Sequence, residues 1–122
     1  MGVLYHTHVL DDKILGWLER LSIPVPPLAT SRNPTPREVR RVLDGLTDCT
    51  IRYEIVNGDY WCAWVHHREA RFVHTLVHIT HVGGDDDERP VWFEKGDPEL
   101  IIRIVEGLTR TCGPLVLRAD TG

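Results

Sequence analysis

Apolar residues recur at helical spacing in three stretches of the chain, and a start signal precedes each stretch. In the first stretch, Asp11 or Asp12 is placed to cap a helix. The apolar stripe that follows is Ile14, Leu15, Leu18 and Leu21. A group of prolines comes next, at Pro24, Pro26 and Pro27. Because proline lacks an amide hydrogen, we expect the helix to end before them and residues 22–34 to form a surface loop.

The second and third stretches each begin with a proline at the first helical position. Thr35 precedes Pro36, and Glu38 stands where its carboxylate can reach back to the Thr35 amide, which is the pattern of a capping box. Asp97 precedes Pro98 in the same way. The apolar stripes are Val39, Val42, Leu43 and Leu46 in the second helix, and Leu100, Ile101, Ile104, Val105 and Leu108 in the third. Both stretches therefore predict amphipathic helices with one face for a core.

Strict alternation of apolar and polar residues from Ile51 to Ile55 predicts a β-strand, and Asn57-Gly58 is typical of a type I′ hairpin turn. The pairs expected from that turn are Ile55 with Tyr60, Tyr53 with Cys62, and Ile51 with Trp64. This register assigns to the core face Ile51, Tyr53, Ile55, Tyr60, Cys62 and Trp64. The other face, which we expect to be partly solvated, then carries Arg52, Glu54, Trp61, Ala63 and Val65.

Residues 71–82 are rich in β-branched side chains, which favours a strand, with a helix as the alternative. Residues 3–9 look strand-like, although their pairing stays open, and residues 91–94 and 115–117 are short strands. The order of elements is (β)ααββββαβ. We therefore predict a single α+β domain spanning residues 1–122. It has a mostly antiparallel sheet of four or five strands and helices packed on one face.

Composition and charge narrow the classes of function. The 122 residues carry a formal charge of −4, which disfavours general nucleic-acid binding, and no apolar run approaches the roughly 18 residues of a membrane-spanning helix. The three cysteines are widely spaced without a CxxC motif, and the start of the chain lacks the pattern of a signal peptide. We therefore expect reduced thiols and a cytoplasmic location.

Seven histidines are present, and five of them lie between His66 and His81. In a helix, His74, His78 and His81 would share one face at zinc-ligand spacing, whereas in a strand His81 would point away from the other two. A strand-based zinc site would combine His66, His74 and His78, with a carboxylate from Glu69 or Glu94. The alternative is a set of histidines on a half-solvated sheet face. No HExxH or other catalytic motif is present, so no catalytic residue is assigned.

Two clusters of like charge stand out. Four consecutive acids follow Gly83-Gly84: Asp85, Asp86, Asp87 and Glu88. Without the alternating spacing of a calcium loop, they predict a solvated loop or a patch that steers a basic partner. Four arginines gather near the second helix: Arg32, Arg37, Arg40 and Arg41. A DNA-recognition helix would show such charge, but no partner helix completes a helix-turn-helix motif, so nucleic-acid binding is disfavoured.

The chain has four tryptophans, and the functional hypothesis is based on two of them. Trp61 lies on the predicted solvated face of the hairpin, and Trp92 lies on a neighbouring strand. An exposed aromatic face usually marks a binding site for a protein partner or a second copy. The predicted contact residues are Trp61 and Trp92 as anchors, with Asp85, Asp86, Asp87 and Glu88 for steering. We therefore predict a non-enzymatic interaction domain of the general class of immunity proteins, secretion chaperones and adaptors. The alternative is a small zinc-dependent enzyme.

Overall fold

A computed structural model describes residues 3–25, 30–57, 60–80 and 84–120 of the chain. Within these ranges there are three helices and six strands. The helices are α1 (Asp12–Arg20), α2 (Pro36–Asp44) and α3 (Pro98–Cys112). The strands are β1 (Leu4–Val9), β2 (Cys49–Asn57), β3 (Tyr60–His67), β4 (His74–Thr80), β5 (Val91–Gly96) and β6 (Leu115–Asp120).

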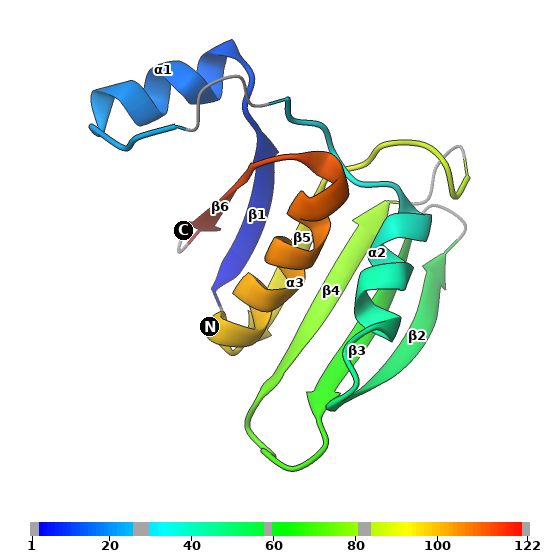
Figure 1. Cartoon of the computed structure of the whole chain (residues 1–122). Helices are drawn as coiled ribbons and strands as arrows, with labels where there is room; N and C mark the ends of the chain where they lie inside the picture. Colours follow the sequence, from blue (N-terminus) through cyan, green and yellow to red (C-terminus); the bar gives the residue numbers. More distant parts are fainter. Residues whose placement is uncertain (1–2, 26–29, 58–59, 81–83, 121–122) are drawn as a thin grey trace.

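The strands form one antiparallel sheet in the order β2-β3-β4-β5-β1-β6. Helices α2 and α3 lie side by side over one face of the sheet, and α1 lies beyond the end of β1 (Figure 1). The predicted α+β class is confirmed. The sheet is larger than the predicted four or five strands because residues 4–9 pair between β5 and β6.

The predicted helix starts are confirmed in detail. The hydroxyl of Thr35 accepts a hydrogen bond from the amide of Glu38, and the Glu38 carboxylate accepts one from the Thr35 amide at 3.0 Å. Asp97 caps α3, and of the two candidates for α1 it is Asp11 that caps the helix. Each cap satisfies an amide that has no partner within the first helical turn.

The core lies between the sheet and the two helices α2 and α3. Its largest fully buried apolar side chains are Val39, Leu43, Val65, Val77, Ile79, Val91, Phe93, Leu100, Ile101, Ile104 and Leu108. The helical members come from the predicted stripes, and the strand members alternate along β3, β4 and β5. Burying each such side chain contributes about 1.5–3 kcal/mol, so this layer holds the fold together.

The segment 71–82 forms a strand and not a helix. Within β4, Thr75, Val77 and Ile79 are buried and the residues between them are partly exposed, which is the period of two expected for a strand. Phe72 precedes the strand in a turn and is 86% exposed. His81, which the helical alternative included, lies outside the described residues.

The predicted register of the β2–β3 hairpin is wrong by one residue. Ile55 pairs with Trp61 and Tyr53 pairs with Ala63, and the register shifts between Ile55 and Asn57. The shift takes one extra residue, Val56, into β2, as in a β-bulge. Because side chains alternate along a strand, a slip of one residue turns every β3 side chain to the other face. The turn residue Gly58 lies outside the described residues.

Two glycines allow close approach between neighbouring segments. Gly96 at the end of β5 has a φ of 115°, and a Cβ added there would lie 2.2 Å from the carbonyl oxygen of His74. Gly107 on α3 faces Val42 on α2, where an added Cβ would lie 2.7 Å from Cγ1. The first glycine permits the irregular pairing of β4 with β5, and the second permits tight packing of the two helices.

Candidate functional site

One face of the sheet has neither α2 nor α3 over it (Figure 1). Directly paired residues share a face, so the strand registers define its members. The side chains of this surface, termed the open sheet face, are Leu4, His6, His8, Thr50, Arg52, Glu54, Cys62, Trp64, His66, His74, Leu76, His78, Thr80, Trp92, Glu94, Val116, Arg118 and Asp120. Helix α1 reaches its β6 margin, where the Arg118 guanidinium lies 5.4 Å from the centre of the Trp17 ring.

A stacked pair of rings lies at the centre of this face. His78 on β4 stacks on Trp92 on β5, with ring centroids 5.1 Å apart and planes 4° from parallel. The Nε2 atom of His78 lies 3.0 Å from a carboxylate oxygen of Glu94, and the His78 side chain is 12% exposed. Trp92 is half-buried. The imidazole therefore fixes the orientation of an indole that is partly exposed to solvent.

A second tryptophan lies near the β2 side of the same face. The indole nitrogen of Trp64 donates a hydrogen bond to Glu54 at 3.2 Å, and the guanidinium of Arg52 lies 5.5 Å from the centre of a Trp64 ring. Trp64 is half-buried, as is Leu76 on the neighbouring strand. The open sheet face thus presents two oriented indoles and a leucine, bordered by charges of both signs.

Trp61, which we predicted to share a surface with Trp92, lies on the opposite face of the sheet. It is 5% exposed and packs in the core, with its ring 5.6 Å from that of Tyr53 and edge-on to it. The prediction of a Trp61–Trp92 surface was wrong because the hairpin register is shifted. Trp64 replaces Trp61 in that surface. Residues 61–65 are nearly all apolar and show no alternation, so the sequence held no signal to identify the outward indole.

The predicted zinc ligands do not converge. His66 and His74 face each other across β3 and β4 with stacked rings, 5.7 Å between centroids. His78 lies four positions further along β4, about 13 Å away at the rise of a strand. Glu94 lies beside His78, and Glu69 lies in the turn after β3. No three histidine, cysteine or acidic side chains within the described ranges are arranged to hold a metal ion.

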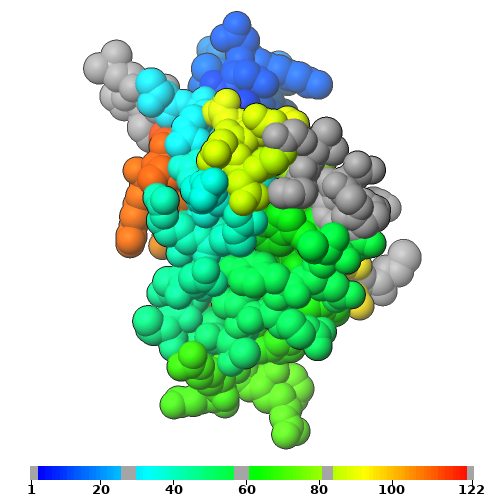
Figure 2. All heavy atoms as spheres, turned by 90° about the vertical axis from the view of Figure 1, so that its right-hand side faces the viewer, coloured from blue at the N-terminus to red at the C-terminus, as the bar shows by residue number. Residues whose placement is uncertain are grey.

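The acidic loop lies against the start of α2 (Figure 2). Arg40 forms an ion pair with Asp85, and Arg37 forms one with Asp86 at 2.9 Å. The Arg37 amide also donates to the carbonyl of Asp85. The more distant pairs are Arg32 with Glu88 at 3.9 Å and Arg89 with Asp87 at 3.7 Å. The two predicted charge clusters therefore compensate each other, which leaves less charge on either to attract a partner.

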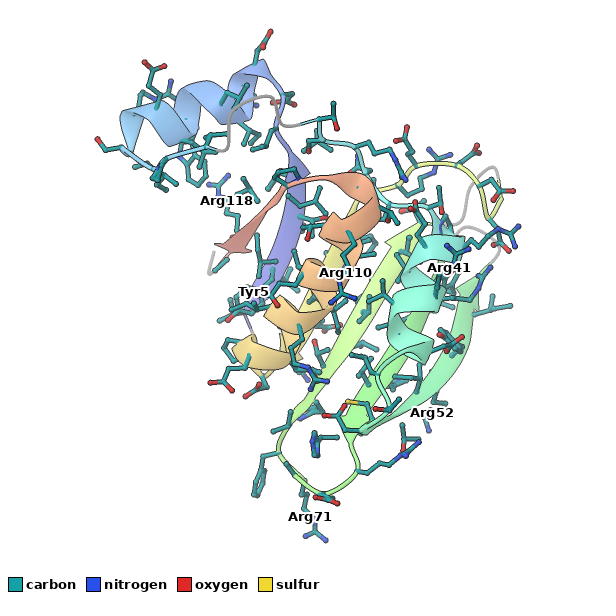
Figure 3. The ribbon with its side chains drawn as sticks, in the orientation of Figure 1. Tyr5, Arg41, Arg52, Arg71, Arg110 and Arg118 are labelled. Carbon is teal, nitrogen blue, oxygen red and sulfur yellow. The ribbon has the colours of Figure 1, made fainter. Side chains whose placement is uncertain are left out.

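A groove of about 510 Å³ lies between α2 and α3. Arg41 and Arg110 stand on its two helical walls (Figure 3), and Val42 and Gly107 lie between them. Glu106 also borders the groove, so its lining mixes both signs of charge. Arg103 and Glu38 line the groove as well, and both are already in ion pairs, Arg103 with Asp48 and Glu38 with Arg32.

The cysteines are all buried. Burial raises the pKa of Cys49 to about 11 and also raises the pKa values of Cys62 and Cys112. A nucleophilic cysteine reacts as the thiolate, which these surroundings disfavour. The three thiols therefore serve packing.

No protein-family model, curated protein or solved structure matches this chain. Among the described helices, none is both long and apolar enough to cross a membrane.

Proposed function

We propose that this protein is a non-enzymatic interaction domain that binds a protein partner through the open sheet face. The observation that carries the proposal is the pair of half-buried indoles, Trp64 and Trp92, on a sheet face without a covering helix. The solvated face of an antiparallel sheet normally carries polar residues. Tryptophans held in fixed orientation at such a place are typical of the centre of a protein interface.

The chemistry of the surface defines the partner that fits it. Arg52 and Glu54 flank Trp64, and Glu94 lies beside His78 at the centre. This mixture of charges does not match a phosphate backbone, which requires a surplus of positive charge. It matches a protein patch with an apolar centre and a rim of mixed charge. Such one-to-one recognition is the work of immunity proteins, chaperones and adaptors.

The acidic loop is not needed in this proposal. Asp85 and Asp86 already pair with arginines of α2, and α2 covers the other face of the sheet. A partner on the open sheet face therefore does not meet these carboxylates directly.

A photo-crosslinking experiment in cells of the source organism tests the proposal. A photoreactive phenylalanine analogue replaces Leu76 at the centre of the open sheet face, and in a matched control it replaces Ile102, which is 46% exposed on α3. We expect a discrete crosslinked protein from position 76 that is absent from position 102. Equal products from both positions would mean that the sheet face has no special affinity.

The crosslinked protein is then purified, and its dissociation constant is measured by calorimetry against Trp64→Ala, Trp92→Ala and Ile102→Ala. Each tryptophan variant is expected to raise the Kd about 30-fold, which corresponds to about 2 kcal/mol for a residue at the centre of an interface. The Ile102 variant is expected to leave it unchanged. An unaltered Kd in both tryptophan variants, with the fold intact by circular dichroism, would overturn the proposal.

A further inference from the structure

Strand β2 forms one edge of the sheet, and within the described residues it pairs with β3 alone. An edge strand presents a row of backbone amides and carbonyls that can pair with another strand. The other edge, β6, has α1 beside it, through the contact of Arg118 with Trp17. Figure 2 views the molecule from the β2 side.

The apolar side chains of this edge are unusually exposed. Ile55 is 79% exposed, Val56 is 45% exposed and Tyr53 is 39% exposed. Proteins usually protect an edge by making it short, by placing a proline or charged side chains in it, or by a β-bulge such as the one at the end of β2. β2 has nine residues and no proline. The shift in register after Ile55 ends the regular part of the strand there, so the regular part spans the seven residues 49–55, and its last five are 51–55.

The sequence of these five residues, Ile51-Arg52-Tyr53-Glu54-Ile55, is complementary to itself. When two copies run antiparallel with Tyr53 opposite Tyr53, each Arg52 lies opposite a Glu54 of the second copy. Each Ile51 then lies opposite an Ile55 of the second copy. Opposite charges and β-branched side chains are favourable as direct cross-strand pairs.

We propose that two copies of this chain associate through β2 in this register, which forms one continuous sheet across a two-fold axis. A two-fold axis makes every contact occur twice, so a strand that pairs with itself must be complementary about its centre. The β2 sequence meets that condition at Tyr53.

In other registers of the antiparallel β2–β2 pair, the sequence is not complementary about the centre of the pair. A slip of one residue places Arg52 opposite Tyr53 or Ile55, so the charges lose their partners. A slip of two residues places Arg52 opposite Arg52, or Glu54 opposite Glu54, and like charges directly opposite each other destabilise a sheet. The charges therefore select the register centred on Tyr53.

The inference does not depend on the proposed function. Arg52 and Glu54 flank Trp64 on the open sheet face, so the dimer would join two such faces side by side without covering either. A protein partner can bind to a monomer or to a dimer, and failure of one proposal leaves the other standing.

Two charge-reversal variants test the register directly. In a homodimer of Arg52→Glu, the introduced carboxylate lies opposite Glu54 twice, and in a homodimer of Glu54→Arg, the introduced guanidinium lies opposite Arg52 twice. Since two attractive pairs become repulsive, we expect the Kd of each homodimer to rise about tenfold or more. In a one-to-one mixture of the two variants, each pair again joins opposite charges. We therefore expect the mixture to associate as the wild type does.

Analytical ultracentrifugation over about a hundredfold range of protein concentration measures these constants, because association follows mass action. Matched controls carry the same charge changes away from the edge: Arg71→Glu in the β3–β4 turn (Figure 3) and Glu99→Arg at the start of α3. Circular dichroism confirms that each variant is folded. A wild type that stays monomeric over the whole range would overturn the proposal, as would variants whose mixture associates no better than each alone.

Discussion

The imidazole of His78 and the indole of Trp92 lie parallel on adjacent strands, 5.1 Å between ring centroids and 4° between planes. Glu94 holds the other side of the imidazole through Nε2. An indole that is already oriented loses little conformational entropy when it binds. The stacking of His78 on Trp92 within the sheet therefore favours binding of a partner to the open sheet face.

This relationship predicts an energetic coupling between the two rings. In a double-mutant cycle of His78→Ala and Trp92→Ala, we expect a coupling of about 1 kcal/mol in the free energy of unfolding, because either substitution alone removes the stacking. Urea denaturation of the four proteins measures it. A cycle of His78→Ala with Trp64→Ala serves as the control and should give a coupling close to zero. Additive effects in the first cycle would show that the stacked geometry does not contribute to stability.

The two tryptophans of β3 are predicted to differ in their effect on stability. Trp61 is 5% exposed in the core, so Trp61→Ala is expected to lower the free energy of unfolding by about 3–5 kcal/mol. Trp64 is half-buried on the open sheet face, and Trp64→Ala is expected to cost about 1–2 kcal/mol. Urea denaturation of both variants measures these two losses of stability. The reverse order of stabilities would support the hairpin register that the sequence predicts instead of the one in the structure.

The same two residues show where prediction from the sequence ends. The N-terminal caps of the three helices and the proline starts of α2 and α3 are local signals, and they located all three helices correctly. The class of the fold followed from the order of these elements. The face of each β3 side chain depended instead on a single extra residue at Val56, and an apolar run such as 61–65 fits either face. A slip of one residue was enough to exchange Trp61 for Trp64 in the candidate site.

The charge clusters show a second limit. Arg37 and Asp86 are 49 residues apart in the sequence and form an ion pair in the structure. Taken separately, one cluster looks like a site for phosphates and the other like a site for a basic partner. The sequence alone does not bring the loop onto α2, because that contact depends on how β2, β3 and β4, which separate the two segments along the chain, pair in the sheet.

Glu38 makes stability depend on pH. The bidentate hydrogen bonds from Arg32, at 2.7 and 2.8 Å, lower the pKa of Glu38 from the ordinary 4.5 to about 2. A carboxyl whose pKa falls on folding stabilises the protein above its unfolded pKa, and this contribution is lost as the pH falls through the folded value. We expect Glu38→Gln to cost about 2 kcal/mol at neutral pH, since Arg32 is 41% exposed and solvent screens the pair in part.

Thermal unfolding between pH 7 and pH 2 tests this expectation. The difference between wild type and Glu38→Gln should be constant above about pH 4.5 and should shrink toward pH 2. The control is Glu106→Gln, which removes an exposed carboxylate of α3 and should leave the profile close to that of the wild type. A difference that stays constant down to pH 2 would mean that the charge of Glu38 is not the cause.

Gly96 is predicted to be essential for the pairing of β4 with β5. Its φ of 115° is strained for any other residue, and an added Cβ would lie 2.2 Å from the His74 carbonyl oxygen and 2.7 Å from Cβ of Thr75. Since both the backbone conformation and the contact oppose a side chain, Gly96→Ala is expected to lower the free energy of unfolding by about 3–4 kcal/mol.

Gly84 provides a matched control, because its φ is 109° but no atom lies within 4 Å of an added Cβ. Gly84→Ala should therefore cost only about 1–2 kcal/mol, from conformation alone. Urea denaturation of the two variants separates the two contributions, and equal losses of stability would show that the close approach to His74 adds nothing.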